Sequence, residues 1–417
     1  MNPLAVAVVW LGTGTAGALL LPRLRLRRLA MVVPLAGLAA IVVAGAGSSP
    51  IQFLATTVSI SSVDRAGQGL LAAAAVSLTA AVILAPSLSG SESFAIGLVG
   101  GATVIALATD SVAVWAIALT AAVAALAVRW LTATPSRATL AAGRVAGGGA
   151  AALLGAGLFL PLPDVAGPRP VLVAILLASG VAALMALLPL GGWAAGGYSS
   201  LRGIDVAPWQ LLLAPAVLLS TARLTAALPS ASAAVFGRAL LVMALATAVW
   251  NGLQAARAPL STRYGRAFLT DLALAAAAVG GTRSSVALTA GLLMVLTHLL
   301  LGPVLLPLHE EPRRRRPQRV AWALLSGLPP TPSFWGRFLV LEALAQTNAA
   351  LLYPALVAAA LIFVAATLAF LPGQTRRSGA APGPGMLAAG VSWLLVGGGV
   401  ALGLVPQGIT SMIFGSQ

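Results

Sequence analysis

Residues 327–338, Gly-Leu-Pro-Pro-Thr-Pro-Ser-Phe-Trp-Gly-Arg-Phe, interrupt a long apolar stretch that runs from 319 to 347. Pro329, Pro330 and Pro332 cannot continue a helix, because each lacks a backbone donor and clashes with the preceding turn. A second interruption follows residue 187, in the sequence Leu-Pro-Leu-Gly-Gly-Trp around Pro189. Within lipid, such breaks are tolerated only where protein or a water-filled cavity satisfies the freed backbone groups. The two segments therefore predict broken membrane helices inside a larger bundle.

The composition of the chain requires a membrane environment. Hydrophobic residues make up 59% of the 417 residues and charged residues only 8%, whereas a soluble domain carries about 25% charged residues. We therefore predict an all-α integral membrane protein with about fourteen transmembrane helices, because fourteen apolar stretches approach spanning length. They cover residues 3–21, 29–47, 66–86, 93–109, 111–131, 141–161, 171–190, 208–228, 236–256, 265–281, 285–307, 319–347, 350–371 and 384–406.

The arginines predict the topology. All 24 basic residues are arginine. If the N-terminus is outside, the odd-numbered connections are cytoplasmic, and basic residues concentrate in cytoplasmic loops. We therefore expect a bacterial cytoplasmic membrane protein with both termini outside, and no nucleic-acid partner is needed to explain the net charge of +15. These inner connections hold 18 of the 24, namely Arg23, Arg25, Arg27, Arg28, Arg129, Arg137, Arg144, Arg202, Arg257, Arg263, Arg266, Arg313, Arg314, Arg315, Arg316, Arg319, Arg376 and Arg377.

The spacing of the two breaks predicts an internal repeat. They fall in the seventh and twelfth predicted spans, five spans apart. An odd number of spans per repeat makes the repeats inverted relative to each other, an arrangement typical of transporters with a working site at mid-membrane. We expect N-terminal helices at 1–90, a first repeat at 91–230, a second repeat at 231–372 and a C-terminal helix at 373–417.

Segment 327–338 resembles the signature GLPPTAGFxGKF of the antiporter-like membrane subunits of respiratory complex I. This superfamily includes chains L, M and N of NADH-quinone oxidoreductase, of which chain N is nearest in length, and subunits of Mrp antiporters and membrane-bound hydrogenases. Weaker similarities follow in family order: residues 109–116 resemble the entry to span five, 189–193 the pattern PFHGWLPDA, and 206–220 the pattern EAPTPVSALLxxxxxK. The resemblance implies a fourteen-span subunit of an ion-translocating assembly whose other subunits are also hydrophobic.

The resemblance also implies a proton relay, which this sequence lacks. The family's glutamate on span five falls on Ala118, and its lysine on span eight falls at about Ser220. The lysine of span seven falls within residues 181–187, where nothing ionises. His298 is kept on span eleven, but the lysine four residues later is Gly302, and the lysine of span twelve is Arg337. Because arginine stays charged even when buried, we do not expect the lysine-based relay to operate.

Five ionisable residues are candidates for a reduced proton path: Asp110, Asp271, His298, Arg337 and Glu342. Ionisable groups inside a membrane usually mark function, but each has a structural alternative. Asp110 could cap the helix of span five, and Asp271 could pair with an arginine at the cytoplasmic face. His298 could be a hydrogen-bonded packing residue. Arg337 could satisfy carbonyls freed by the break and pair with Glu342 in the next turn.

Two functions remain open. The first is a structural, non-catalytic subunit of a complex I-like or antiporter assembly, with at most a reduced proton path. The second is an autonomous secondary transporter of an ion or a small solute that uses Asp271 and His298. We expect no cofactor and no metal, since the chain has no cysteine and few acids. The run Arg313–Arg316 is expected to anchor the topology, or to contact acidic lipid or a peripheral subunit.

Overall fold

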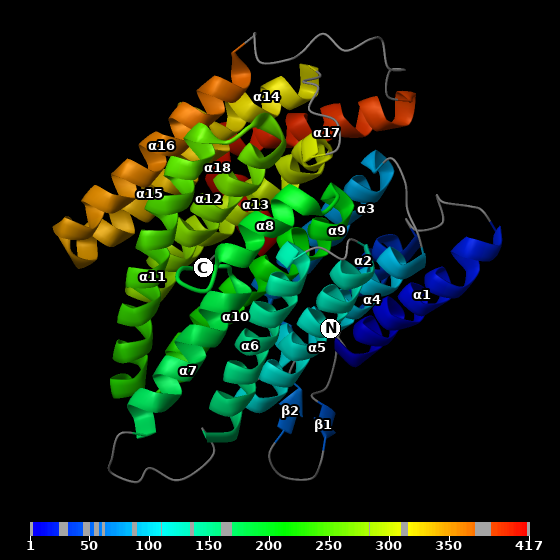
Figure 1. Cartoon of the computed structure of the whole chain (residues 1–417), viewed down its shortest axis with the longest axis horizontal. Helices are drawn as coiled ribbons and strands as arrows, with labels where there is room; N and C mark the ends of the chain where they lie inside the picture. Colours follow the sequence, from blue (N-terminus) through cyan, green and yellow to red (C-terminus); the bar gives the residue numbers. More distant parts are fainter. Residues whose placement is uncertain are drawn as a thin grey trace.

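The computed structural model describes residues 3–24, 32–44, 51–53, 58–60, 63–85, 90–109, 111–133, 137–159, 169–282, 284–309, 316–371 and 385–414. Figure 1 shows a helical bundle, with α1, α2 and α4 on one side and α15 and α16 on the other. The helices are α1 (Pro3–Leu24), α2 (Val32–Ala44), α3 (Arg65–Leu84), α4 (Gly90–Ala108), α5 (Val112–Ala133), α6 (Arg137–Phe159), α7 (Arg169–Leu184), α8 (Gly192–Ser200), α9 (Gly203–Pro208), η2 (Trp209–Leu213), α10 (Ala214–Ala227), α11 (Ser230–Arg257), α12 (Leu260–Thr282), α13 (Ser285–Leu305), η3 (Leu306–His309), α14 (Arg316–Leu325), α15 (Pro332–Thr347), η4 (Ala349–Leu351), α16 (Leu352–Phe370), α17 (Met386–Leu404) and α18 (Pro406–Phe414). A short antiparallel pair, β1 (Ile51–Phe53) and β2 (Val58–Ile60), pairs Ile51 with Ile60.

Each predicted span coincides with a helix or with a broken helix. Within the described residues, nine helices are long and apolar enough to cross a membrane: α1, α3, α4, α5, the continuous α9–α10 segment, α11, α13, η4–α16 and α17. The other five predicted spans correspond to the shorter α2 and α7, to α6, to the more polar α12 and to the interrupted α14–α15 pair. The chain is therefore a multi-pass membrane protein of all-α type, as predicted. The division into inverted repeats stays a prediction.

Both predicted breaks are confirmed. Helix α7 ends at Leu184 and α8 begins at Gly192, with Pro189 in the turn between them. Helix α14 ends at Leu325 and α15 begins at Pro332, with Pro329 and Pro330 in the turn. Pro332 occupies the first turn of α15, where its missing N–H costs no helical hydrogen bond.

Side chains from other elements satisfy the backbone groups that the first break frees. The indole N–H of Trp193 donates to the carbonyl of Ala183 at 3.0 Å, and that of Trp209 donates to the carbonyl of Leu184 at 2.9 Å. The N–H of Leu188 donates to Thr247 Oγ1 at 2.7 Å. This break is thus enclosed and hydrogen-bonded, as a break at membrane depth must be.

The helix at the centre of the bundle is irregular. Helix α9 continues through the π-helical turn η2 into α10, and every residue from 203 to 221 is buried. Pro208 lies at the start of the irregularity, where it removes a backbone donor. Such π-turns are frequent at functional sites, and this one carries Gln210, a side chain of the candidate functional site.

Candidate functional site

Asp271, His298 and Arg337 meet in one buried centre, although they come from three helices, α12, α13 and α15. Arg337 Nε lies 3.0 Å from Asp271 Oδ1, and Arg337 Nη2 lies 3.0 Å from Asp271 Oδ2. His298 Nε2 lies 3.0 Å from Asp271 Oδ2. All three side chains are at most 5% exposed. The carboxylate is therefore held by a two-point arginine contact, which is strong and directional, and by an imidazole.

Arg337 also binds the second broken helix. Its Nη1 donates to the carbonyl of Ser326 at 3.1 Å, and its Nη2 donates to the carbonyl of Leu325 at 2.9 Å. These carbonyls lie at the end of α14, where the helix stops. Gly327, with a φ of 84°, leaves room for this contact, because a Cβ there would stand 2.5 Å from Arg337 Nη1. The predicted carbonyl-binding role of Arg337 is confirmed.

Two predicted pairings are wrong. Glu342 does not meet Arg337: its side chain is exposed, and its Oε1 accepts a hydrogen bond from Gln346 Nε2 at 3.3 Å. Asp271 pairs with Arg337 in the interior and not with an arginine at the cytoplasmic face; the nearby Arg266 donates to Asn251 Oδ1 at 2.7 Å. Asp110 lies outside the described residues, as do Arg313, Arg314 and Arg315. Arg316 begins α14 and is exposed.

A chain of buried hydrogen bonds runs from this centre to the first broken helix. Tyr264 Oη lies 3.4 Å from His298 Nδ1. Gln210 Nε2 donates to Tyr264 Oη at 2.6 Å, and Tyr198 Oη donates to Gln210 Oε1 at 2.5 Å. The side chains of Tyr198, Gln210 and Tyr264 are all at most 2% exposed. None of these three residues was predicted from the sequence, although a glutamine inside an apolar span is itself a signal of a buried polar contact.

The absence of a side chain at Gly302 leaves room for this chain of hydrogen bonds. It stands at the position that holds lysine in the resembled family. A Cβ at Gly302 would lie 2.8 Å from Tyr264 Oη and 3.4 Å from Gln210 Nε2. The contact between the Tyr264 hydroxyl and the Gln210 amide thus occupies the room beside the glycine.

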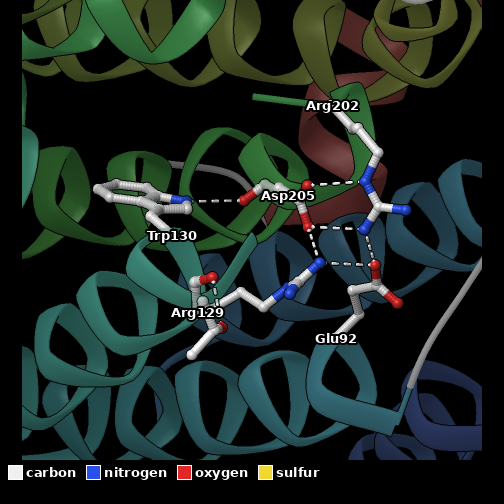
Figure 2. A network of polar contacts seen from close by, with 6 residues as sticks. Glu92, Arg129, Trp130, Arg202 and Asp205 are labelled. Carbon is white, nitrogen blue, oxygen red and sulfur yellow. Dashed lines mark hydrogen bonds and ion pairs between the residues drawn. The ribbon is translucent and has the colours of Figure 1, made fainter. Parts of the chain in front are cut away.

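A second charged cluster lies at the ends of α4, α5 and α9 (Figure 2). Arg129 Nη2 contacts Glu92 Oε1 at 2.8 Å and Asp205 Oδ1 at 2.6 Å. Arg202 Nε contacts Asp205 Oδ2 at 3.0 Å, and Arg202 also pairs with Glu92. Trp130 Nε1 donates to the backbone carbonyl of Asp205 at 2.9 Å. Two cations and two anions cancel in formal charge, so the cluster joins three helices without a net buried charge.

From the sequence, Arg129 and Arg202 were interpreted only as markers of cytoplasmic loops. Arg129 is not a loop residue, because it lies within α5 and is buried, with 8% of its side chain exposed. The acidic partners were the missed signal: Glu92 and Asp205 are two of only nine acids in the chain, and both flank apolar spans.

A cavity of about 120 Å³ opens beside Ser220, at the position of the family's lysine on span eight. Thr109, Ser111, Trp115 and Arg223 line it. The Ser220 hydroxyl donates to the carbonyl of Ala216 at 2.7 Å. In the part of the chain that the structure describes, no group of three or more His, Asp or Glu side chains could hold a metal ion.

No protein-family model matches the sequence, and no curated protein sequence matches it. Solved structures do. A chain of the Mrp complex from Dietzia sp. superposes with a TM-score of 0.84 at 16% identity, over 99% of this chain and 51% of that one. A chain of respiratory complex I from Thermus thermophilus gives 0.78 at 21% identity, over 99% of this chain and 100% of that one. A chain of the membrane-bound sulfane sulfur reductase, an archaeal respiratory membrane complex, gives 0.80 at 16% identity, over 98% and 96%.

These matches show that the chain shares its fold with chains of the Mrp complex, of respiratory complex I and of the sulfane sulfur reductase, in agreement with the resemblance at the level of the fold. The chain spans about half the length of the matched Mrp chain and nearly all of the two respiratory chains.

Proposed function

We propose that this chain is a structural, non-catalytic membrane subunit of an ion-translocating assembly related to complex I or to Mrp antiporters. The fold that it shares with chains of such complexes supports an assembly with other hydrophobic subunits. In this proposal it lies in a bacterial cytoplasmic membrane with both termini outside.

The contacts that Arg337 makes in the Asp271 centre are the main support for this proposal. A proton relay needs sites that take up and release a proton during the cycle. Arg337 cannot release one, and its N–H groups are directed at Asp271 and at two carbonyls of the broken helix. The centre therefore secures the α14–α15 break, which supports a structural role.

The experiment is purification of the tagged chain in a mild detergent, followed by mass spectrometry of the proteins that accompany it. We expect several hydrophobic subunits of a redox or antiporter assembly. Arg337→Leu should reduce their recovery, whereas the matched control Arg238→Leu, at an exposed arginine on α11, should not. Recovery of the native chain alone, folded and monodisperse, would overturn the proposal.

One observation favours a second candidate, an autonomous ion transporter. Asp271 and His298 are in direct contact at buried positions, and an imidazole can accept and release a proton. This candidate predicts that purified protein in liposomes moves protons or sodium ions, and that His298→Ala and Asp271→Asn each abolish this flux at unchanged protein abundance. Flux that survives both substitutions removes the candidate.

A further inference from the structure

A chain of hydrogen bonds leads from Asp271 through His298, Tyr264 and Gln210 to Tyr198. The Asp271–Arg337 ion pair determines which group donates in each of these bonds. A carboxylate held by arginine accepts hydrogen bonds and donates none. His298 Nε2, 3.0 Å from that carboxylate, must therefore carry a hydrogen. In the neutral ring Nδ1 is then an acceptor, so the hydrogen bond over 3.4 Å is donated by the Tyr264 hydroxyl.

The same reasoning orients the Gln210 amide. Because the Tyr264 hydrogen points to His298, the Tyr264 oxygen is free to accept, and Gln210 must present its NH₂ group to it. The amide oxygen then faces Tyr198, whose hydroxyl donates to it. Each donor points from α8 toward Asp271, and the neutral ring has its hydrogen on Nε2.

Protonation of His298 by a proton from water reverses this order. The new hydrogen on Nδ1 must be donated to the Tyr264 oxygen, and the Tyr264 hydrogen must turn toward Gln210. A buried NH₂ group facing that hydrogen cannot accept it, and a buried polar group without a partner is costly. A half-turn of the amide brings Oε1 to Tyr264 and Nε2 to Tyr198.

We propose that Gln210 is a two-position switch, whose amide turns over when His298 gains a proton and so changes the hydrogen bond of Tyr198 on α8. A carboxamide does not take up and pass on a proton at ordinary pH, so the orientation is transmitted while the proton stays on His298. Gln210 is thus a positioning residue that links the second broken helix to the first. This switch does not depend on the assembly that the chain joins.

The groups that face His298 are few. Tyr264 and Asp271 come from α12, and Arg337 comes from α15. Other described charged residues on elements packed against α13 bind elsewhere or are exposed: Arg65 on α3, Arg223 on α10, Arg263 and Arg266 on α12, Arg316 and Arg319 on α14, and Glu342 on α15.

The protein allows a direct test of this switch, because its sequence has only two histidines, His298 and His309. In a His309→Gln background with ¹⁵N-labelled histidine, nitrogen NMR of the protein in bilayers reports the tautomer and the protonation of His298 alone. We expect the neutral ring to carry its hydrogen on Nε2. We expect Tyr198→Phe to change the proton affinity of His298 by about threefold, the effect of one hydrogen bond acting through the chain.

Two further variants separate the switch from a general disturbance. In the Gln210→Met background, which removes the amide at similar size, Tyr198→Phe should leave His298 unchanged. Tyr353→Phe, at the exposed third tyrosine, should do nothing in either background. A neutral ring with its hydrogen on Nδ1 would overturn the proposal. So would a Tyr198→Phe effect that is absent with Gln210 present, or one that persists in the Gln210→Met background.

Discussion

Because Gly302 has no side chain, the space beside it can hold the contact between Tyr264 and Gln210. The family resemblance puts lysine here, but in this chain the space beside the glycine holds the Tyr264 hydroxyl and the Gln210 amide. Both groups are buried, and a buried polar pair contributes most when each member has a partner. A residue with a Cβ at this position is therefore incompatible with the present contact.

We predict that Gly302→Ala destabilises the protein although alanine favours helices. The added Cβ would lie 2.8 Å from Tyr264 Oη, so the ring must shift and its link to Gln210 weakens. The cost is about 1–3 kcal/mol, as for other overpacked sites, and it should lower the Tm in detergent. The control is Gly390→Ala on α17, where nothing lies within 4 Å of the added methyl. An equal or higher Tm for Gly302→Ala would contradict the prediction.

The sequence identified the buried ionisable residues, but it did not predict which residues they contact. Asp271, His298 and Arg337 stood out because ionisable groups are rare in apolar spans. Their association was not predictable, since 66 residues separate Asp271 from Arg337 and no local pattern states which faces meet. Glu342 was a poor partner for a geometric reason: residues five apart on a helix point about 140° apart, whereas those three or four apart share a face.

Among the elements, the α9–η2–α10 helix connects the two charged regions of the bundle. Asp205 on α9 belongs to the second charged cluster, and Gln210 on η2 belongs to the hydrogen-bond chain that reaches Asp271. Between them, Trp209 packs edge-to-face against Trp193 and Phe268, with ring centroids 5.1 and 5.7 Å apart. Such aromatic pairs favour one relative placement of their helices. The α9–η2–α10 helix is thus held in position by the ion pairs of Asp205, by the aromatic contacts of Trp209 and by the hydrogen bonds of Gln210.

The second charged cluster gives a prediction at the scale of the elements. Arg129→Gln leaves Glu92 and Asp205 buried opposite the single cation of Arg202, and breaking a buried pair in this way costs about 3–5 kcal/mol. Glu92→Gln together with Arg129→Gln removes one charge of each sign and should recover much of that loss. A double-mutant cycle on thermal unfolding in detergent measures the coupling. Arg238→Gln, at an exposed site, should change little. Strictly additive effects of Glu92→Gln and Arg129→Gln would contradict the predicted coupling between these two residues.

For the molecule as a whole, hydropathy and proline spacing were sufficient to predict the helices and both breaks. These features follow from the bilayer itself, because spanning helices must be apolar and about twenty residues long. Tertiary partners were not predictable in this way. Arg129 is one of several arginines near a span end, and only the packing of α4, α5 and α9 distinguishes it from a loop residue.

The arginine distribution predicts the orientation of the whole molecule in the membrane, and the absence of cysteine from the sequence allows a direct test. Single cysteines at Ser199 on α8, Met386 at the start of α17 and Ala349 in η4 occupy exposed positions. With both termini outside, Ser199 and Met386 lie on the cytoplasmic side and Ala349 lies on the outer side, since the arginine-rich connections face the cytoplasm. A membrane-impermeant thiol reagent should therefore label Ala349→Cys in intact cells, and Ser199→Cys and Met386→Cys only after permeabilisation. Labelling of all three in permeabilised cells is the control for reactivity. The reverse pattern in intact cells would invert the topology, and labelling of Ser199→Cys together with Ala349→Cys would place an error in the number of spans between them.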